Sequence, residues 1–79
     1  MGQHARPKPK RLAAKLFAIR KRLGVSQSEM VRLLNARFTS ARVSEYESGT
    51  REPSLLTILA YSRVAKIPVE KIIDDKLTI

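Results

Sequence analysis

The chain has 79 residues, no cysteine, one histidine and a formal net charge of +9 at pH 7. The lack of cysteine excludes disulfide bonds and thiolate zinc sites, and the single histidine, His4, lies in a polar stretch that offers no partner for metal binding or catalysis. The length suffices for one small domain. The apolar runs are too short to cross a bilayer and no signal-like apolar segment opens the chain, so we expect a cytoplasmic protein without a membrane partner.

Positive charge is concentrated near the start of the chain. Residues 1–22 hold eight lysines and arginines and no acid, whereas the rest of the chain holds eight against seven acids. Residues 1–10, MGQHARPKPK, contain two prolines and almost nothing to bury, which predicts a flexible basic arm before a folded domain at residues 11–79. The arm is either a solubilising leader or a ligand for a polyanion, since contact with phosphates releases condensed counterions. The positive charge alone is equally compatible with DNA, RNA or an anionic lipid as the partner.

The periodicity of apolar residues predicts five short helices and no strand, so the expected fold class is all-α. In the first, residues 11–23, the apolar stripe consists of Leu12, Leu16, Ile19 and Leu23. Gly24 then ends the helix. A fourth helix follows Pro53 and Ser54, with Leu55, Ile58, Leu59, Ser62 and Ala65 sharing a face, and a short fifth follows Pro68.

The second and third helices are marked by capping signals. Ser26 and Glu29 have the spacing of a capping box, and Val25 and Met30 have that of a hydrophobic staple. Cap and staple recur before the third helix at Phe38, Thr39 and Val43, and Gly49 ends that helix. These signals predict two helices joined by a turn.

The third predicted helix, residues 40–48, has two different faces. Its inward face holds Val43, Tyr46 and Glu47, and its outward face holds Ala41, Glu45 and Ser48, flanked by Arg42 and Ser44. An arginine in a first turn opposes the helix dipole, unless the helix end meets phosphates or guanine edges. An inward carboxylate needs a cation, because unpaired burial is costly. Arg20, at the flank of the first apolar stripe, is the expected partner of Glu47 in a structural ion pair.

Three segments together resemble a known family. They are IRKRLGVSQSEM from Ile19, VSEYESGTREPS from Val43, and AYSRVAKIPVEKII in the last part of the chain. From about Leu16 to Asp74 the chain resembles the phage-repressor-like (lambda repressor/Cro, Xre) helix-turn-helix DNA-binding domains. The resemblance implies a compact five-helix domain whose third helix enters the DNA major groove. We therefore expect a sequence-specific, double-stranded DNA-binding regulator of transcription, a repressor that acts as a homodimer.

The resemblance also implies site residues. Base-reading positions fall on Ser40, Ala41, Arg42 and Glu45, and phosphate-contacting positions fall on Gln27, Ser44, Thr50 and Arg51. Arg42 can bind guanine bidentately, Glu45 can accept from cytosine or orient Arg42, and Ala41 can touch a thymine methyl. Arg20 and Glu47 match a buried ion pair of the family, in agreement with the argument from helical faces. No cofactor, metal or enzymatic activity is implied, since no nucleophile with a base and no phosphate-binding loop is present.

The chain departs from the family pattern in its central turn. From Leu34 to Val43 it has two residues more than the common spacing, because NARF replaces a shorter turn that usually contains glycine. The register of the third helix on DNA therefore depends on how residues 35–38 fold.

An alternative function is an adaptor or antitoxin of the same fold that mainly binds another protein. Its apolar contacts would be Phe17, Leu77 and Ile79. Phe17 lies about 140° from the apolar stripe of its helix. It is therefore expected either to pack under the C-terminal end of the chain or to face a partner.

Overall fold

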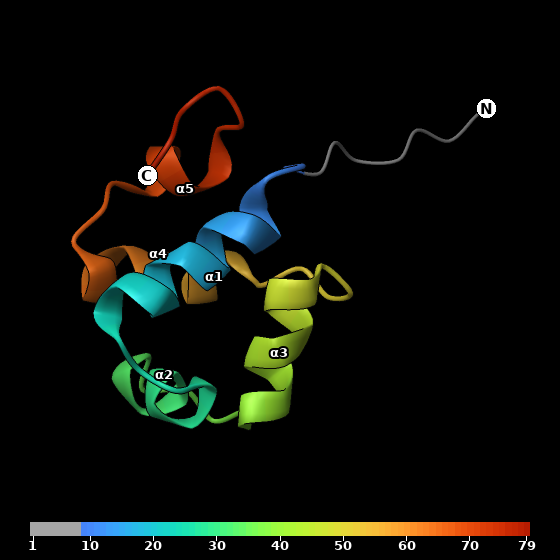
Figure 1. Cartoon of the computed structure of the whole chain (residues 1–79), viewed down its shortest axis with the longest axis vertical. Helices are drawn as coiled ribbons and strands as arrows, with labels where there is room; N and C mark the ends of the chain where they lie inside the picture. Colours follow the sequence, from blue (N-terminus) through green and yellow to red (C-terminus); the bar gives the residue numbers. More distant parts are fainter. Residues whose placement is uncertain (1–8) are drawn as a thin grey trace.

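The computed structural model describes residues 9–79, which form five helices and no strand (Figure 1). The helices are α1 (Leu12–Leu23), α2 (Gln27–Leu33), α3 (Ser40–Ser48), α4 (Leu55–Ala65) and α5 (Val69–Ile73). The predicted all-α class is confirmed. Most of the predicted arm falls on residues 1–8, which lie outside the described residues. Among residues 9–79, no helix has the length and apolar character needed to span a membrane.

Local capping chemistry sets most helix boundaries. The Ser26 hydroxyl accepts a hydrogen bond from the Glu29 amide at 3.0 Å, and the Glu29 carboxylate accepts one from the Ser26 amide at 2.8 Å. α1 and α3 end at Gly24 and Gly49, whose φ angles of 70° and 82° lie in the left-handed region that glycine adopts without steric cost. Thr39 holds the predicted N-cap position of α3, but its side chain makes no capping hydrogen bond.

All five helices contribute to one apolar core or to its rim. Its most deeply buried side chains are Leu16, Ile19, Met30, Val43, Tyr61 and Ile72. The predicted inward stripes are wrong at Leu23 and Leu55, which are exposed. In α4 the predicted Ile58 is buried, together with Tyr61, which the pattern did not assign to the core. Tyr61 is the largest fully buried side chain among the described residues.

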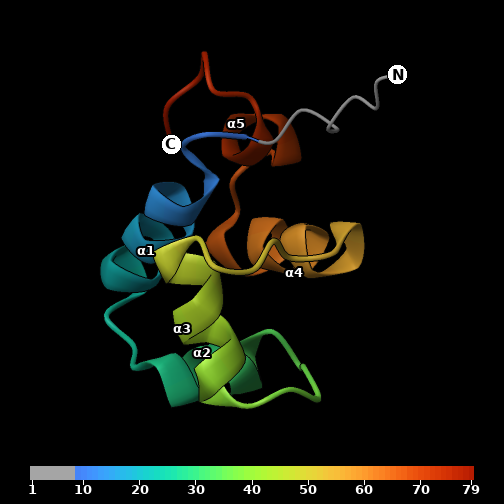
Figure 2. The same cartoon turned by 90° about the vertical axis from the view of Figure 1, so that its right-hand side faces the viewer.

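Helix α1 is the central element of the packing. It contacts α3, α4 and α5, while α2 packs against α3. In Figures 1 and 2, α2 and α3 form one end of the molecule and α5 forms the other. One side of α3 is therefore covered by α1 and α2, and its opposite side faces outward.

The longer central turn has a defined helix-ending geometry. Asn35 adopts a positive φ of 53°, and the Ala36 amide donates to the Val31 carbonyl at 3.1 Å, five residues back. This is the geometry of a Schellman motif, in which asparagine replaces the usual glycine. Ala36 and Phe38 then pack against the core. The two extra residues thus lie in an anchored turn.

Candidate nucleic-acid interface

The two faces of α3 differ as the sequence predicts. Val43 and Tyr46 are buried in the core. Ala41 and Ser44 are exposed, whereas Ser40, Arg42 and Glu45 are partly exposed. The outward surface of α3 therefore presents a methyl group, two hydroxyls, a guanidinium and a carboxylate, a mixture able to contact base edges and phosphates.

Aromatic contacts fix the start of α3. The rings of Phe38 and Tyr46 meet edge to face, with centroids 5.6 Å apart. The guanidinium of Arg42 lies over the Phe38 ring, 5.7 Å from its centroid. Aromatic pairs and cation–π contacts of this kind each contribute roughly 0.5–1.5 kcal/mol. The longer turn thus supplies a support for Arg42 that the sequence pattern did not predict, since the pattern assigned Phe38 only a staple contact.

Glu45 pairs with Arg51 more closely than with Arg42. The Arg51 Nε donates to Glu45 Oε1 at 2.8 Å, whereas the Arg42 Nε lies 3.5 Å from the same oxygen. All three side chains are partly exposed, so these pairs stabilise the fold little. Their main consequence is geometric, because Glu45 holds Arg51 beside α3 and leaves Arg42 less tightly paired.

The predicted phosphate-contacting residue Thr50 lies just beyond the end of α3. Its amide donates to the Glu45 carbonyl at 3.0 Å, and its hydroxyl lies 3.0 Å from the Ser48 hydroxyl. Both hydroxyls donate to the Glu45 carbonyl near the end of the helix. Thr50 is exposed, and its position is fixed by the helix end.

Arg20 and Glu47 form a nearly buried, bidentate ion pair. The Arg20 Nε and Nη2 donate to the two Glu47 carboxylate oxygens at 2.7 and 3.0 Å. The Arg20 and Glu47 side chains expose only 12% and 5% of their surface. The hydrogen bond to Glu47 raises the pKa of Arg20 above its ordinary value. Arg20 Nη1 also donates to the Val25 carbonyl at 2.9 Å, so the pair joins α1, the following loop and α3.

Gln27 is held by the same carboxylate. Its Nε2 donates to Glu47 Oε1 at 3.2 Å. Gln27 opens α2, and its side chain is partly exposed. The inward carboxylate of α3 therefore orients a polar side chain at the start of α2.

The other described acidic residues do not form a metal centre. Within residues 9–79, no three histidine, cysteine or acidic side chains gather where they could hold an ion. Phe17, for which the sequence left packing and a partner surface open, does not belong to the apolar core or to the side chains packed against it. It is 45% exposed and contacts the cations of Arg20 and Lys21. Leu77 is also exposed, whereas Ile79 packs against the core.

The paired helices α2 and α3 and the outward polar face of α3 define a helix-turn-helix domain. The family model for helix-turn-helix domains, HTH_3, matches residues 16–72. The chain therefore belongs to this family, the phage-repressor-like (lambda repressor/Cro, Xre) helix-turn-helix domains.

Among solved structures, the chain is similar to that of the P22 c2 repressor protein in complex with synthetic operator 9T in the presence of Tl⁺. The match has a TM-score of 0.72 and 19% sequence identity, and covers 81% of this chain and 94% of that chain. At this identity the similarity establishes the shared fold. Among curated proteins, none matches the chain.

Proposed function

We propose that this protein is a sequence-specific, double-stranded DNA-binding regulator of transcription, and a repressor, with α3 in the major groove. The observation that carries the proposal is the partition of α3, whose apolar side and Glu47 are buried while its polar side faces outward. Family membership supports the same function, as does the similar fold of a repressor solved with a synthetic operator.

On this proposal, Arg42 is the principal base-reading residue. Its guanidinium is supported by the Phe38 ring and is only loosely paired with Glu45, so it can reach the O6 and N7 atoms of guanine. Ser40 and Ala41 contact neighbouring bases from the first turn. Glu45 orients Arg42 or accepts from cytosine.

Phosphate contacts come from both sides of α3. The proposed residues are Gln27, Ser44, Thr50 and Arg51. Gln27 is oriented by Glu47, and Arg51 is held at 2.8 Å by Glu45. These contacts position the domain on DNA without reading its sequence.

The proposal is tested by selecting duplexes from a random pool and measuring the affinity of the full chain for the selected sequence. Arg42→Ala should cost about 1–3 kcal/mol and relax specificity at one base position. The matched control is Arg63→Ala, which removes an exposed arginine from α4. Equal affinity of the unmodified protein for selected and random duplexes at moderate salt would contradict the proposal.

We further propose that residues 1–10 form a basic arm on a domain of residues 11–79, and that the arm contacts the DNA backbone. Neutralising Arg6, Lys8 and Lys10 should weaken binding to all sequences to a similar degree. It should also reduce the slope of log K against log salt by about 0.9 for each phosphate that the arm no longer neutralises. Loss of specificity with an unchanged salt slope would contradict this role.

A homodimer on DNA and a cytoplasmic location complete the proposal. One domain of this size reads a single half-site, so a second copy doubles the contacted sequence. Sedimentation of the protein with duplexes carrying one or two half-sites measures the stoichiometry. Two copies on a two-half-site duplex are expected, and one copy on each type of duplex would contradict the dimer.

The alternative, a protein-binding adaptor or antitoxin, is favoured only by exposed apolar side chains such as Phe17 and Leu77. A stoichiometric protein partner that survives nuclease treatment and no longer binds after Phe17→Ser would support it. The polar outward face of α3 favours DNA.

A further inference from the structure

The carboxylate of Glu45 lies between two arginines on the outward side of α3. Its Oε1 atom accepts a hydrogen bond from Arg51 Nε at 2.8 Å, and Arg42 Nε lies 3.5 Å from the same oxygen. The three side chains expose between 38% and 50% of their surface, so each can also reach a ligand in solution. One carboxylate oxygen thus has two cations within reach and is hydrogen-bonded to one of them.

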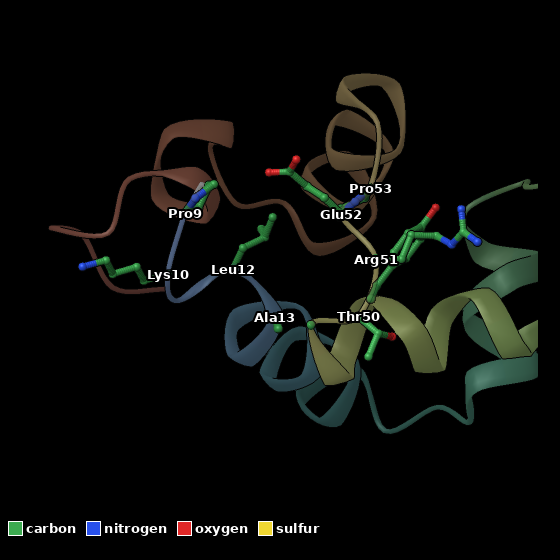
Figure 3. Close-up of a pocket in the computed structure, with 10 residues that line it drawn as sticks. Pro9, Lys10, Leu12, Ala13, Thr50, Arg51, Glu52 and Pro53 are labelled. Carbon is green, nitrogen blue, oxygen red and sulfur yellow. The ribbon is translucent and has the colours of Figure 1, made fainter. Parts of the chain in front are cut away.

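The backbone places Arg51 beside Glu45. The Arg51 amide donates to the Glu45 carbonyl at 3.3 Å, next to the Thr50 amide at 3.0 Å. Figure 3 shows the Arg51 side chain directed away from Pro9 and Lys10, which line the far side of a pocket, and back along the ribbon of α3. Because the Arg51 backbone is already fixed, the ion pair with Glu45 needs to order only side chains.

Arg42 is supported by a different group. Its guanidinium lies over the Phe38 ring, 5.7 Å from the ring centroid. A contact with the face of an aromatic ring leaves N–H groups of the guanidinium available. Bidentate binding of guanine needs two of these donors, and a carboxylate that approaches Arg42 would take the same donors. Glu45, three residues along the helix, is therefore a competitor of guanine for Arg42 unless another group holds it.

Arg51 has enough donors to hold Glu45 and to contact a phosphate. A guanidinium carries five N–H donors, and Glu45 accepts from the one on Nε. The donors on the two Nη atoms suffice for a phosphate, which is the contact already proposed for Arg51. The same side chain can therefore make the phosphate contact and hold Glu45 while the domain is bound to DNA.

We propose that Arg51 is a positioning residue for base reading: by holding the Glu45 carboxylate, it prevents Glu45 from closing on Arg42 and leaves Arg42 free to bind guanine. The inference rests on the proposed DNA-binding function. Without Arg51, the carboxylate loses its nearer cation, and Arg42 is the other one within reach. Of the two roles proposed for Glu45, acceptance from cytosine is the one that this arrangement permits. An arginine that served only as a phosphate contact would not affect which base is read.

The test measures discrimination, in the full chain, at the base pair where Arg42→Ala relaxes specificity. The selected duplex is compared with a duplex in which only that base pair is replaced, and the ratio of the two dissociation constants is determined for each variant. The variants are Arg51→Ala, Glu45→Ala and the double variant. Ser44→Ala is the matched control, because it removes another proposed phosphate contact from an exposed position of α3. Melting curves establish that each variant is folded at the temperature of the measurement.

We expect Arg51→Ala to lower the discrimination ratio about three- to fivefold, near the upper limit of what an exposed charge pair contributes. Its affinity for both duplexes should also fall, because a phosphate contact is lost. Ser44→Ala should lower affinity and leave the ratio within about 1.5-fold of that of the unmodified protein. In the Glu45→Ala background, Arg51→Ala should leave the ratio unchanged to the same degree, since the competing carboxylate is absent.

Three results would overturn the inference. The first is a discrimination ratio that Arg51→Ala leaves unchanged, which would make Arg51 a phosphate contact only. The second is an equal loss of discrimination with and without Glu45, which would show that Arg51 does not act through that carboxylate. The third is a selected duplex in which no position depends on Arg42. Failure of the unmodified protein to prefer the selected duplex is a different result, because it removes the proposed function itself.

Discussion

Glu47 is the residue at which the stability of the fold and the proposed reading of DNA meet. Its carboxylate accepts from Arg20 with both oxygens and from Gln27 with one. The group is almost fully buried, so removal of Arg20 leaves a charge without its partner in a region of low polarity.

We therefore predict that Arg20→Ala and Glu47→Ala each lower the free energy of unfolding by about 3–5 kcal/mol. Urea unfolding followed by circular dichroism measures the change. Arg63→Ala, on the exposed side of α4, serves as control and should stay within about 0.5 kcal/mol of the unmodified protein. Unchanged unfolding midpoints for both ion-pair variants would show that the pair is not structural.

For Tyr61 we predict a substitution that raises the free energy of unfolding. Its hydroxyl is buried without a hydrogen-bond partner among the described residues, and burial raises its pKa above the ordinary value. An unsatisfied buried hydroxyl costs about 1–3 kcal/mol. Tyr61→Phe keeps the ring and removes this cost, so the unfolding free energy should rise by about 1 kcal/mol. A fall of that size in the same urea experiment would mean that the hydroxyl has a partner.

At the scale of elements, the turn between α2 and α3 sets the position of α3, the proposed reading helix. Asn35 adopts a left-handed conformation, and Phe38 links the turn to Tyr46 and Arg42. A displaced turn would move Arg42, the proposed base-reading residue, relative to the rest of the domain. The stability of α3 and the placement of its outward face thus depend on the same few residues.

The conformation of Asn35 is tested by two substitutions. Asn35→Gly should leave the unfolding free energy within about 0.5 kcal/mol, because glycine adopts a positive φ readily. Asn35→Val should lower it by about 1–2 kcal/mol, since a β-branched side chain clashes in the left-handed region. Thermal melts distinguish the two. Equal melting temperatures for the glycine and valine variants would contradict the Schellman geometry.

Helix boundaries that depend on residues close together in the sequence could be predicted. Ser26 and Glu29 mark the start of α2 because their capping groups lie three residues apart. The orientation of Leu55 could not be predicted, since the apolar pattern of α4 did not show that Tyr61 is buried in the core while Leu55 is exposed.

The same distinction applies to the candidate site. Arg20 and Glu47 could be paired because each is a charge on an inward flank that needs a partner. The pairing of Arg51 with Glu45 could not be predicted, because α3 ends at Gly49 and the chain changes direction between the two residues. The contacts of Asp75 with the start of α1 could not be predicted for a similar reason: the amides that donate to its carboxylate lie at the other end of the sequence.

For the whole molecule, the carboxylates with lowered pKa values predict the effect of acid. The pKa values of Asp75 and Glu29 are lowered first by hydrogen bonds from backbone amides. A carboxylate with a lowered pKa in the folded state contributes stability above its unfolded pKa, about 4, and this contribution is lost as pH falls through the folded value. Stability should therefore decline as the pH falls below about 5.

The contribution of Asp75 to this decline is measurable. Asp75→Asn cannot titrate at this position, so its melting temperature should fall less steeply with acid than that of the unmodified protein. Asp74→Asn, whose residue shows no comparable amide contacts from α1, should follow the unmodified protein. Parallel curves for all three proteins would show that Asp75 contributes nothing to acid sensitivity.

The link between Asp75 and the start of α1 also gives the domain a direction of mechanical weakness. If residues 9 and 79 are pulled apart, the load passes first to the hydrogen bonds of Lys10 and Arg11 with Asp75, and of Arg22 with the Ile79 carbonyl. These hydrogen bonds are exposed, although the Ile79 side chain packs against the core. Under tension the segment after α5 should peel away first, while α2 and α3 still carry no force. Helix α3, the proposed reading helix, would thus be mechanically protected.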